Sequence, residues 1–304
     1  MITGTLEMNI LIAGGSGFLG TALTKSFLND GHKVYILTRG TKKNQNAEAI
    51  QWDVKTTNGW AHRISEMDVV IHLTGKSLST FPWTRATKQS FLNSRLIPGR
   101  LLASAIQAAD KRPSIFIQAS GINYYGLSGS LADESTPPAD DFLAQLSVQW
   151  EDATKSLDDL GVRRIITRSA PVLDKKGSLL DLMSLPIKLF FGGPFGSGKH
   201  AMPWIHIQDW VGAIQYLIAN ENARGAYNLI APSQTSNAEF NKTLAEVLHR
   251  PYWFRTPEFL LRNILGEMSV LILDGRFSQP KRLIEFGYQF QFQSLKEALE
   301  DLVS

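Results

Sequence analysis

The sequence predicts an α/β fold, in which a doubly wound parallel sheet carries a smaller, mainly helical C-terminal lobe. Short apolar segments, often β-branched, alternate with helical patterns through the first half of the 304-residue chain. A glycine-rich turn joins the first strand pattern to the first helix pattern. From Pro171 onwards this alternation gives way to glycine loops and helices, which mark the lobe.

The expected strands of the first half are short apolar runs, typical of strands that helices cover on both faces. They are Asn9–Ala13, Lys33–Thr38, Ile50–Trp52, Val69–Leu73, Ser114–Ala119 and Arg164–Thr167. The helices between them are expected at Phe18–Asn29, Lys88–Ala109 and Phe142–Asp159. Pro98 and Gly99 should bend the middle helix, and Gly31 and Gly161 stand where helix C-terminal caps are needed. Because strands and helices alternate, the crossovers should be right-handed.

The second half predicts two further strands, at Trp204–Ile207 and Tyr227–Ile230. The expected helices are Trp210–Asn220 with Asp209 as N-cap, Asn237–His249 capped by Asn237, Glu258–Leu265, Pro280–Phe286 and Ser294–Leu302. Residues 8–170 are therefore expected to form the sheet domain, which segments within 204–230 complete. Residues 171–304 form an interleaved substrate lobe with a C-terminal domain at about 250–304, and residues 1–7 are an N-terminal extension.

Composition narrows the class of protein. A hydrophobic content of 43% with 19% charged residues is typical of a globular chain. The net charge of +3 comes without a basic and aromatic stripe, so we expect a small-molecule partner and no nucleic acid. The lack of cysteine excludes disulfides and thiolate chemistry and fits a cytoplasmic protein. Glycines interrupt the uncharged stretch Met8–Thr24, so no membrane segment is expected. The C-terminal helices suit a monomer or a homodimer.

The turn after the first strand has the glycine spacing of a dinucleotide site. Gly14 allows a sharp turn, Gly17 allows the backbone to approach a pyrophosphate, and Gly20 allows the helix to pack closely on the strand. The helix N-terminus offers unpaired N–H groups to the same phosphate. Residues 8–170 are therefore predicted to be an NAD(P)-binding domain of Rossmann type. The residues assigned to the pyrophosphate are Gly14, Gly15, Ser16, Gly17, Phe18, Leu19 and Gly20.

The end of the second strand selects the cofactor. An acidic residue there would bind a ribose 2′-hydroxyl and favour NAD(H), whereas a cation pairs with the 2′-phosphate of NADP(H). Thr38 is followed by Arg39, with Lys42 and Lys43 just beyond. We therefore expect NADP(H) in preference to NAD(H), with Thr38 and Arg39 in the site. The alternative is a bare glycine turn with Arg39 as a solvated surface charge.

These residues resemble the short-chain dehydrogenase/reductase superfamily in its extended, NAD(P)-dependent epimerase/dehydratase-like form. The matching segments are Gly14–Gly20, Asp68–Gly75, Ile115–Ser120 and Ile205–Asp209. A narrower resemblance is to an atypical subgroup, the epimerase family proteins, which carry a C-terminal domain of unknown function. It rests on Trp83, Lys88, Ser94-Arg95, Tyr124-Tyr125-Gly126, Gly192-Gly193-Pro194, Pro203–His206, Asn228–Pro232, Asn237–Phe240 and Pro280–Leu283. The resemblance implies the fold and NADP binding, and it implies no known reaction.

The resemblance also implies cofactor contacts beyond the glycine turn. They are Asp53, Leu73, Thr74, Gly75, Ser94, Ser120, Pro171, Val172 and Leu173. The fourth strand should end over the adenosine. The turn after the sixth strand should hydrogen-bond the nicotinamide carboxamide, unless it is only a strand exit. Asp53 is expected to accept a hydrogen bond from the adenine amino group, or to start an Asx-turn. Lys88, Ser94 and Arg95 are either solvated or turned in part toward the cofactor cleft.

The usual catalytic pair of the superfamily is missing. Ordinary members use a tyrosine as acid/base, with a lysine four residues later that lowers the pKa of the tyrosine from the same helix face. None of the seven tyrosines has lysine at that spacing, and the expected positions fall near Leu143 and Ser147. Ser120 remains and is predicted to hold a substrate oxygen, or only to close a turn. Tyr124 or Tyr125 is a candidate proton donor, or a packing aromatic.

Three functions are compatible with these residues. The leading prediction is an NADP(H)-binding oxidoreductase acting on an unidentified small carbonyl or alcohol. A non-catalytic NADP(H)-binding redox sensor is the second, because the catalytic pair is missing. A nucleotide-sugar epimerase is the third, but Met202 stands where such epimerases usually place a phosphate-binding arginine. His206 is expected to be structural, and His206 and Asp209 are too isolated to predict a metal site.

Overall fold

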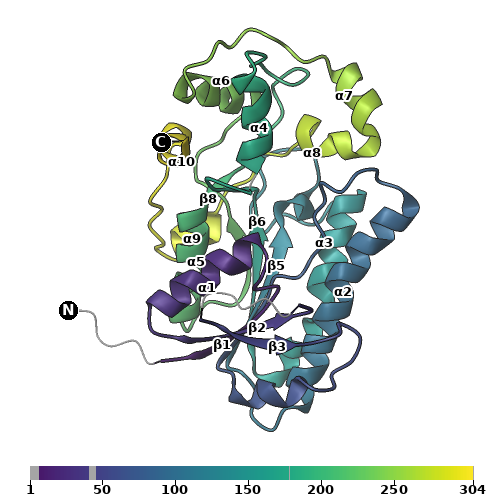
Figure 1. Ribbon diagram of the computed structural model, residues 1–304, viewed down its shortest axis with the longest axis vertical. Helices are drawn as coiled ribbons and strands as arrows, with labels where there is room; N and C mark the ends of the chain where they lie inside the picture. Colours follow the sequence, from purple (N-terminus) through teal and green to yellow (C-terminus); the bar gives the residue numbers. More distant parts are fainter. Residues whose placement is uncertain (1–6, 41–45, 178, 304) are drawn as a thin grey trace, which may run out of the picture.

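The computed structural model describes residues 7–40, 46–177 and 179–303. Within them, seven parallel strands form a central sheet in the order β3-β2-β1-β4-β5-β6-β9 (Figure 1). They are β1 (Asn9–Ala13), β2 (Lys33–Thr38), β3 (Glu48–Gln51), β4 (Val69–His72), β5 (Ile115–Gly121), β6 (Arg163–Ser169) and β9 (Gly225–Leu229). The winding direction reverses between β1 and β4, so the predicted doubly wound α/β fold is confirmed.

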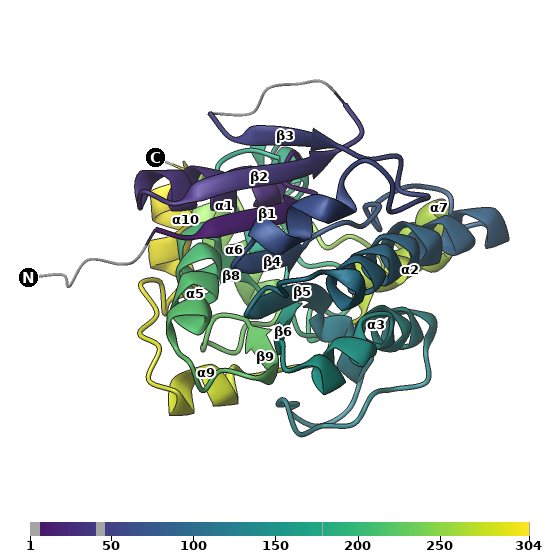
Figure 2. The same cartoon turned by 90° about the horizontal axis from the view of Figure 1, so that it is seen from below.

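Helices cover both faces of this sheet, as its apolar strands require. Figure 2 shows α1 (Phe18–Asn29) and α5 (Ile207–Ala219) on one face, and α2 (Arg85–Ala108) and α3 (Phe142–Asp152) on the other. The 3₁₀ helices of this part are η1 (Ala61–Glu66), η2 (Ile122–Tyr125) and η3 (Lys155–Leu160). The helix expected over Phe142–Asp159 is therefore divided, and Gly161 ends its second piece at a φ of 75°. None of the described helices has the apolar length that a membrane crossing needs.

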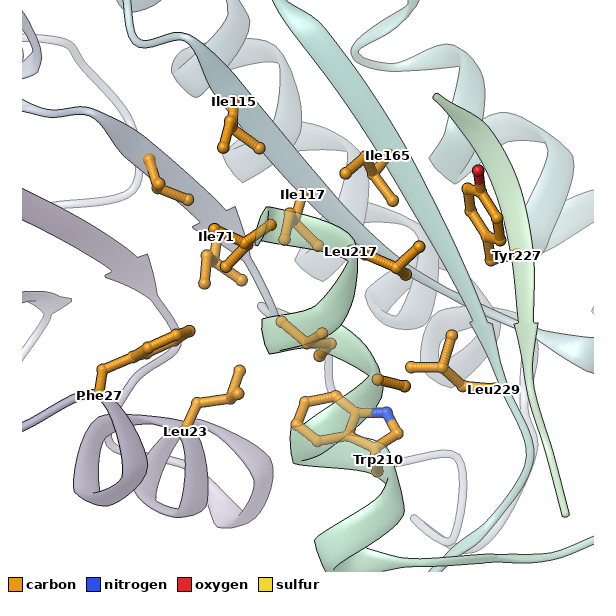
Figure 3. Close-up of a cluster of buried hydrophobic side chains, with 14 of the residues drawn as sticks. Leu23, Phe27, Ile71, Ile115, Ile117, Ile165, Trp210, Leu217, Tyr227 and Leu229 are labelled. Carbon is orange, nitrogen blue, oxygen red and sulfur yellow. The ribbon is translucent and has the colours of Figure 1, made fainter. Parts of the chain in front are cut away.

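Alternate side chains of each strand enter two separate cores, because successive residues of a strand point to opposite faces. Ile12 of β1 packs with Phe27 of α1 and Trp210 of α5, a core that Figure 3 shows in close-up. Its neighbour Leu11 packs instead with Leu102 of α2. Burial of one such side chain contributes about 1.5–3 kcal/mol. This double burial explains why the strands read as continuous apolar runs.

The lobe follows β6 and has a core of its own. Its elements are β7 (Val172–Leu173), α4 (Leu179–Lys188), β8 (Ile205–His206), α6 (Asn237–Val247), α7 (Glu258–Leu265), η4 (Gly266–Ser269), α8 (Val270–Leu273) and α10 (Leu295–Val303), whereas α9 (Lys281–Glu285) packs through Leu283 with the core of α1 and α5. Met183 of α4, Phe240 of α6 and Leu299 of α10 pack together. The strand expected at Trp204–Ile207 stays outside the central sheet, because Ile205 and His206 pair with β7.

Two predicted helix caps are wrong. The α5 helix begins at Ile207, and the N-cap is His206, whose Nδ1 accepts the N–H of Gln208 at 3.2 Å. Asp209 lies inside the first turn, buried, and its carboxylate binds backbone N–H groups of a distant segment. The cap of α6 is Ser236, which forms a capping box with Glu239. The actual caps stand three residues before Asp209 and one residue before Asn237.

Candidate functional site

A cavity of about 820 Å³ lies where the carboxyl ends of β4, β5 and β6 meet the lobe. In open α/β sheets this edge, beside the reversal of strand order, is where ligands bind. The walls bring together residues that the sequence assigned to the cofactor: Phe18, Leu19, Leu73, Gly75, Ser120, Pro171 and Val172. The opposite wall is apolar and comes from the lobe, including Met183, Met202 and Leu271.

The glycine turn is packed so tightly that side chains would not fit. Gly14 has a φ of 89°, and a Cβ there would lie 3.1 Å from the carbonyl carbon of Leu73. A Cβ on Gly20 would lie 2.4 Å from the carbonyl oxygen of Gly14. The N-cap of α1 is Gly17, and no described side chain caps this end or places an acid in its first turn. The N–H groups of that turn therefore fit the pyrophosphate of a dinucleotide.

The remaining turn residues lie around this helix end. A Cβ on Gly15 would lie 2.8 Å from the side chain of Ile36, so Gly15 is held against β2. Ser16 is exposed and lines a second, more open hollow between α1 and α5. The hollow of about 810 Å³ also has Lys25 and Lys176 in its wall. Ser16 thus lies at the outer side of the turn.

The residues predicted to bind the adenosine lie in the loops that follow β2 and β3. Arg39 is exposed at the carboxyl end of β2, and the Thr38 hydroxyl accepts the N–H of Gly40 at 3.2 Å. Lys42 and Lys43 lie outside the described residues. The Asp53 carboxylate accepts the N–H groups of Lys55 and Thr56, each at 2.8 Å. These bonds hold the pKa of Asp53 below its usual range, and they form the Asx-turn that was its alternative role.

Polar side chains fix the loop that follows β4. Thr74 is bonded through its hydroxyl to the buried His72 ring, with 2.6 Å between Oγ1 and Nε2. Ser94 of α2 accepts the N–H of Lys76 at 2.9 Å, so this side chain ties the loop to the helix. Ser94 is not among the residues that line the cavity, whereas the adjacent Arg95 is.

The two positions without the usual catalytic groups lie in the cavity wall. Leu143 and Ser147 of α3 both line the cavity, and the Ser147 hydroxyl donates to the Leu143 carbonyl at 3.0 Å. The two positions predicted to correspond to the superfamily's tyrosine and lysine therefore both face the cavity, as a catalytic pair would. Where the superfamily has its tyrosine and lysine, this chain has the apolar Leu143 and Ser147, whose hydroxyl is bonded within its own helix.

Ser120 is held by a buried ion pair that sequence reasoning missed. Its hydroxyl donates to Oε1 of Glu151 at 2.7 Å. Arg168 donates to both oxygens of that carboxylate, through Nε at 2.9 Å and Nη2 at 2.8 Å. All three side chains are buried. A two-pronged, charge-assisted pair of this kind fixes the carboxylate, which in turn orients the serine.

The candidate tyrosines lie behind Ser120, outside the cavity lining. The Tyr125 hydroxyl is fully buried, donates to Asn228 at 2.7 Å and accepts from Arg168 at 3.0 Å. Burial raises the pKa of Tyr125 to about 12. The guanidinium carbon of Arg168 lies 3.4 Å from the centre of the Tyr124 ring. In this arrangement both tyrosines pack around the ion pair, and their role as proton donors stays a prediction.

The residues predicted to bind the nicotinamide lie at the exit of β6. Pro171 and Val172 line the cavity, whereas the Leu173 side chain is buried in the core of the lobe. The Pro171 carbonyl accepts the N–H of Ile205 at 3.1 Å, which fixes this exit against β8. His206 is buried and stacks on Phe292 with 3.7 Å between ring centres, a packing contact. Among the described residues no cluster of potential metal ligands occurs.

Comparison with known families agrees with this geometry. Residues 10–146 match the NAD dependent epimerase/dehydratase family, and residues 256–302 match a domain of unknown function, DUF1731. Epimerase family protein YfhF of Bacillus subtilis is 37% identical over 303 residues, which are 98% of each chain. Epimerase family protein SAR0825 of Staphylococcus aureus is 35% identical over 97% of this chain and 98% of its own length.

Solved structures show the same fold. Human epimerase family protein SDR39U1 with NADPH superposes with a TM-score of 0.89 at 32% identity, over 97% of this chain and 99% of that one. A nucleoside-diphosphate sugar epimerase from Corynebacterium glutamicum gives a TM-score of 0.78 at 26% identity, over 97% of this chain and 57% of that one. The chain therefore belongs to the NAD-dependent epimerase/dehydratase family, among the atypical short-chain dehydrogenase/reductases called epimerase family proteins.

Proposed function

We propose that the protein is an NADP(H)-dependent oxidoreductase that acts on a small carbonyl or alcohol. The observation that carries this proposal is one cavity whose wall joins Phe18 and Leu19 of the glycine turn to Ser120, which is bonded to the buried Glu151. Arg39 at the end of β2 supports NADP(H) over NAD(H), because a guanidinium pairs with a 2′-phosphate. The NADPH in the human relative of similar length supports the same choice.

Ser120 and Glu151 would handle the proton. The bound cofactor supplies hydride transfer to or from a carbon of the substrate. Because the Ser120 hydroxyl donates to Glu151, its lone pairs can accept the hydroxyl proton of an alcohol. In oxidation that proton passes to Ser120 as the serine proton passes to Glu151. In reduction both transfers run backwards, and Arg168 holds the carboxylate in place throughout.

A redox sensor is the second candidate, and Leu143 and Ser147 favour it. Both line the cavity, where they offer no acid/base pair of the usual kind. Such a protein would bind NADPH and NADP⁺ with different affinities and would not turn over. The sugar-nucleotide epimerase is less well supported, because Met202 presents a buried apolar side chain to the cavity where nucleotide phosphates need a cation.

Calorimetric titration with NADPH, NADP⁺, NADH and NAD⁺ tests the cofactor. Arg39→Ala should weaken NADPH binding about 10- to 100-fold, because this change in affinity corresponds to the free energy of one charge-assisted hydrogen bond. NADH binding should be unchanged. Arg112→Ala removes an exposed arginine that follows α2, beyond its C-terminal end, and should change neither. Equal losses for NADPH and NADH would overturn the assignment of Arg39.

Turnover separates the two candidates. The NADPH-loaded protein should oxidise its cofactor with at least one member of a panel of aldehydes and ketones, followed at 340 nm. If it binds NADPH and turns over none of the panel's carbonyls, nor their alcohols with NADP⁺, the sensor is favoured. If it binds no dinucleotide, both candidates fail.

A further inference from the structure

Arg95 is a buried cation in the cavity wall. It lies on α2 with 7% of its side chain exposed, and it lines the same cavity as Ser120. Its hydrogen bonds all leave from Nη1, to the carbonyls of Lys76 and Phe91 at 3.1 Å and to the Ser94 hydroxyl at 3.4 Å. Nε is buried and has no hydrogen-bond partner in the described part of the chain.

The other buried arginines of the described chain have their charge balanced by a carboxylate or by a helix C-terminus, whereas Arg95 does not. Arg168 is paired with Glu151. Arg163 donates to the carbonyls of Leu217, Asn220, Ala223 and Ile218 around the C-terminus of α5, where the helix dipole favours a cation. No described carboxylate lies within ion-pair distance of Arg95. Burial lowers its pKa to about 10, so it stays charged at neutral pH, and a buried uncompensated charge is costly.

The flat face of the guanidinium lies against a glycine. A Cβ on Gly75 would lie 3.1 Å from Cζ of Arg95, and 3.3 Å from both Nε and Nη2. The guanidinium also lies over the Trp150 ring, with 4.8 Å from Cζ to the ring centre. The guanidinium plane is therefore held in the cavity wall between Gly75 and Trp150. No hydrogen bond to a described residue leaves from Nη2, and a guanidinium N–H is a donor that suits an oxyanion.

We propose that Arg95 binds an oxyanion of a ligand in this cavity, a carboxylate or a phosphate, through Nη2. The inference rests on the proposed function and narrows it, because it makes the ligand that reaches α2 anionic. Two sources carry this chemistry: a phosphate of the dinucleotide and an acid group of the substrate. A substrate acid would join an apolar body, since Leu143 and Met183 line the same cavity.

The test titrates the protein with NADPH, and the NADPH-loaded protein with benzoate and with benzamide, two ligands of equal shape that differ in charge. Wild type, Arg95→Gln, Arg95→Lys and the control Arg100→Gln are compared; Arg100 is exposed on the same helix. Glutamine keeps a hydrogen-bond donor without the charge, and lysine keeps the charge. If Arg95 binds the anion, anion binding should therefore be lost in Arg95→Gln, be recovered in part in Arg95→Lys and be unchanged in Arg100→Gln.

The arms separate the two sources. If Arg95→Gln weakens NADPH about tenfold or more, a cofactor phosphate is the anion. If NADPH binding is unchanged and a wild-type preference of about tenfold for benzoate over benzamide disappears, the anion belongs to the substrate. If Arg95→Gln changes neither, or wild type shows no such preference while NADPH binding is unaffected, the proposal is overturned.

Two further arms keep the result interpretable. If wild type binds no dinucleotide, the proposed function fails, and benzoate against benzamide on the protein alone still tests Arg95. If Arg95→Gln does not fold, Gly75→Ala replaces it, because a methyl group there would lie 3.1 Å from Cζ and would displace the guanidinium while leaving its charge. Gly75→Ala should remove the same binding with a near-native far-UV circular dichroism spectrum; full binding in this variant counts against the site.

Discussion

At the scale of residues, Ser120 is the side chain whose removal tests the chemistry. Ser120→Ala leaves the Glu151–Arg168 pair intact, so the fold should persist. Loss of the relay should lower kcat/KM about 100-fold or more, with NADPH affinity unchanged. The measurement uses the fastest carbonyl of the panel, and Ser120→Thr, which keeps a hydroxyl, should recover part of the rate. Turnover of Ser120→Ala at the wild-type rate would remove the serine from the mechanism.

The same site shows what the residues alone could predict. Ser120 was predictable because it follows a recognisable strand, and the glycine turn because its spacing is local. Glu151 and Arg168 come from α3 and β6, so their contact depends on how a helix packs on a strand. The available signal was the spacing of Leu143, Ser147 and Glu151, four residues apart on one helix face. The sequence left Arg95 either solvated or turned toward the cofactor cleft, because its burial depends on how α2 packs.

At the scale of elements, strands were easier to predict than caps. A strand covered on both faces shows itself as an apolar run, whereas several nearby polar residues can serve as one cap. At α5 the N-cap is His206, because the Asp209 carboxylate makes its hydrogen bonds to another segment. Val172–Leu173 was not predicted as a strand, since two residues make no pattern. Its pairing with β8 brings together segments far apart in the sequence.

Asp209 should be important for stability because it links α5 to the segment before α10. Its carboxylate accepts the N–H of Gln291 at 2.7 Å and that of Phe292 at 2.9 Å, and Tyr288 donates its hydroxyl as well. Asp209→Ala would leave buried donors unpaired, and it should lower the free energy of unfolding by about 2–4 kcal/mol. Urea unfolding measures this, with the exposed Gln208→Ala as the matched control. Equal midpoints for the two variants would contradict the link.

At the scale of the whole molecule, the lobe and the sheet are interleaved. The chain leaves the sheet after β6, builds part of the lobe, returns as β9 and then completes the lobe. Leu283 and Phe290, from the last part of the chain, are buried in the core of α1 and α5. Figure 1 shows α9 next to α5, and α10 nearer α6. The cavity between sheet and lobe is thus built from both ends of the sequence.

This interleaving predicts that the lobe does not unfold by itself. Leu299 of α10 is fully buried in the core of the lobe, and Leu299→Ala should cost about 2–5 kcal/mol. Since β9 and the segment around Phe290 join the two cores, tryptophan fluorescence and far-UV circular dichroism should report one coincident transition at a lower Tm. Lys296→Ala, exposed on the same helix, is the control. A lobe that melts first in Leu299→Ala, with the sheet still folded, would show that the two cores are energetically separate.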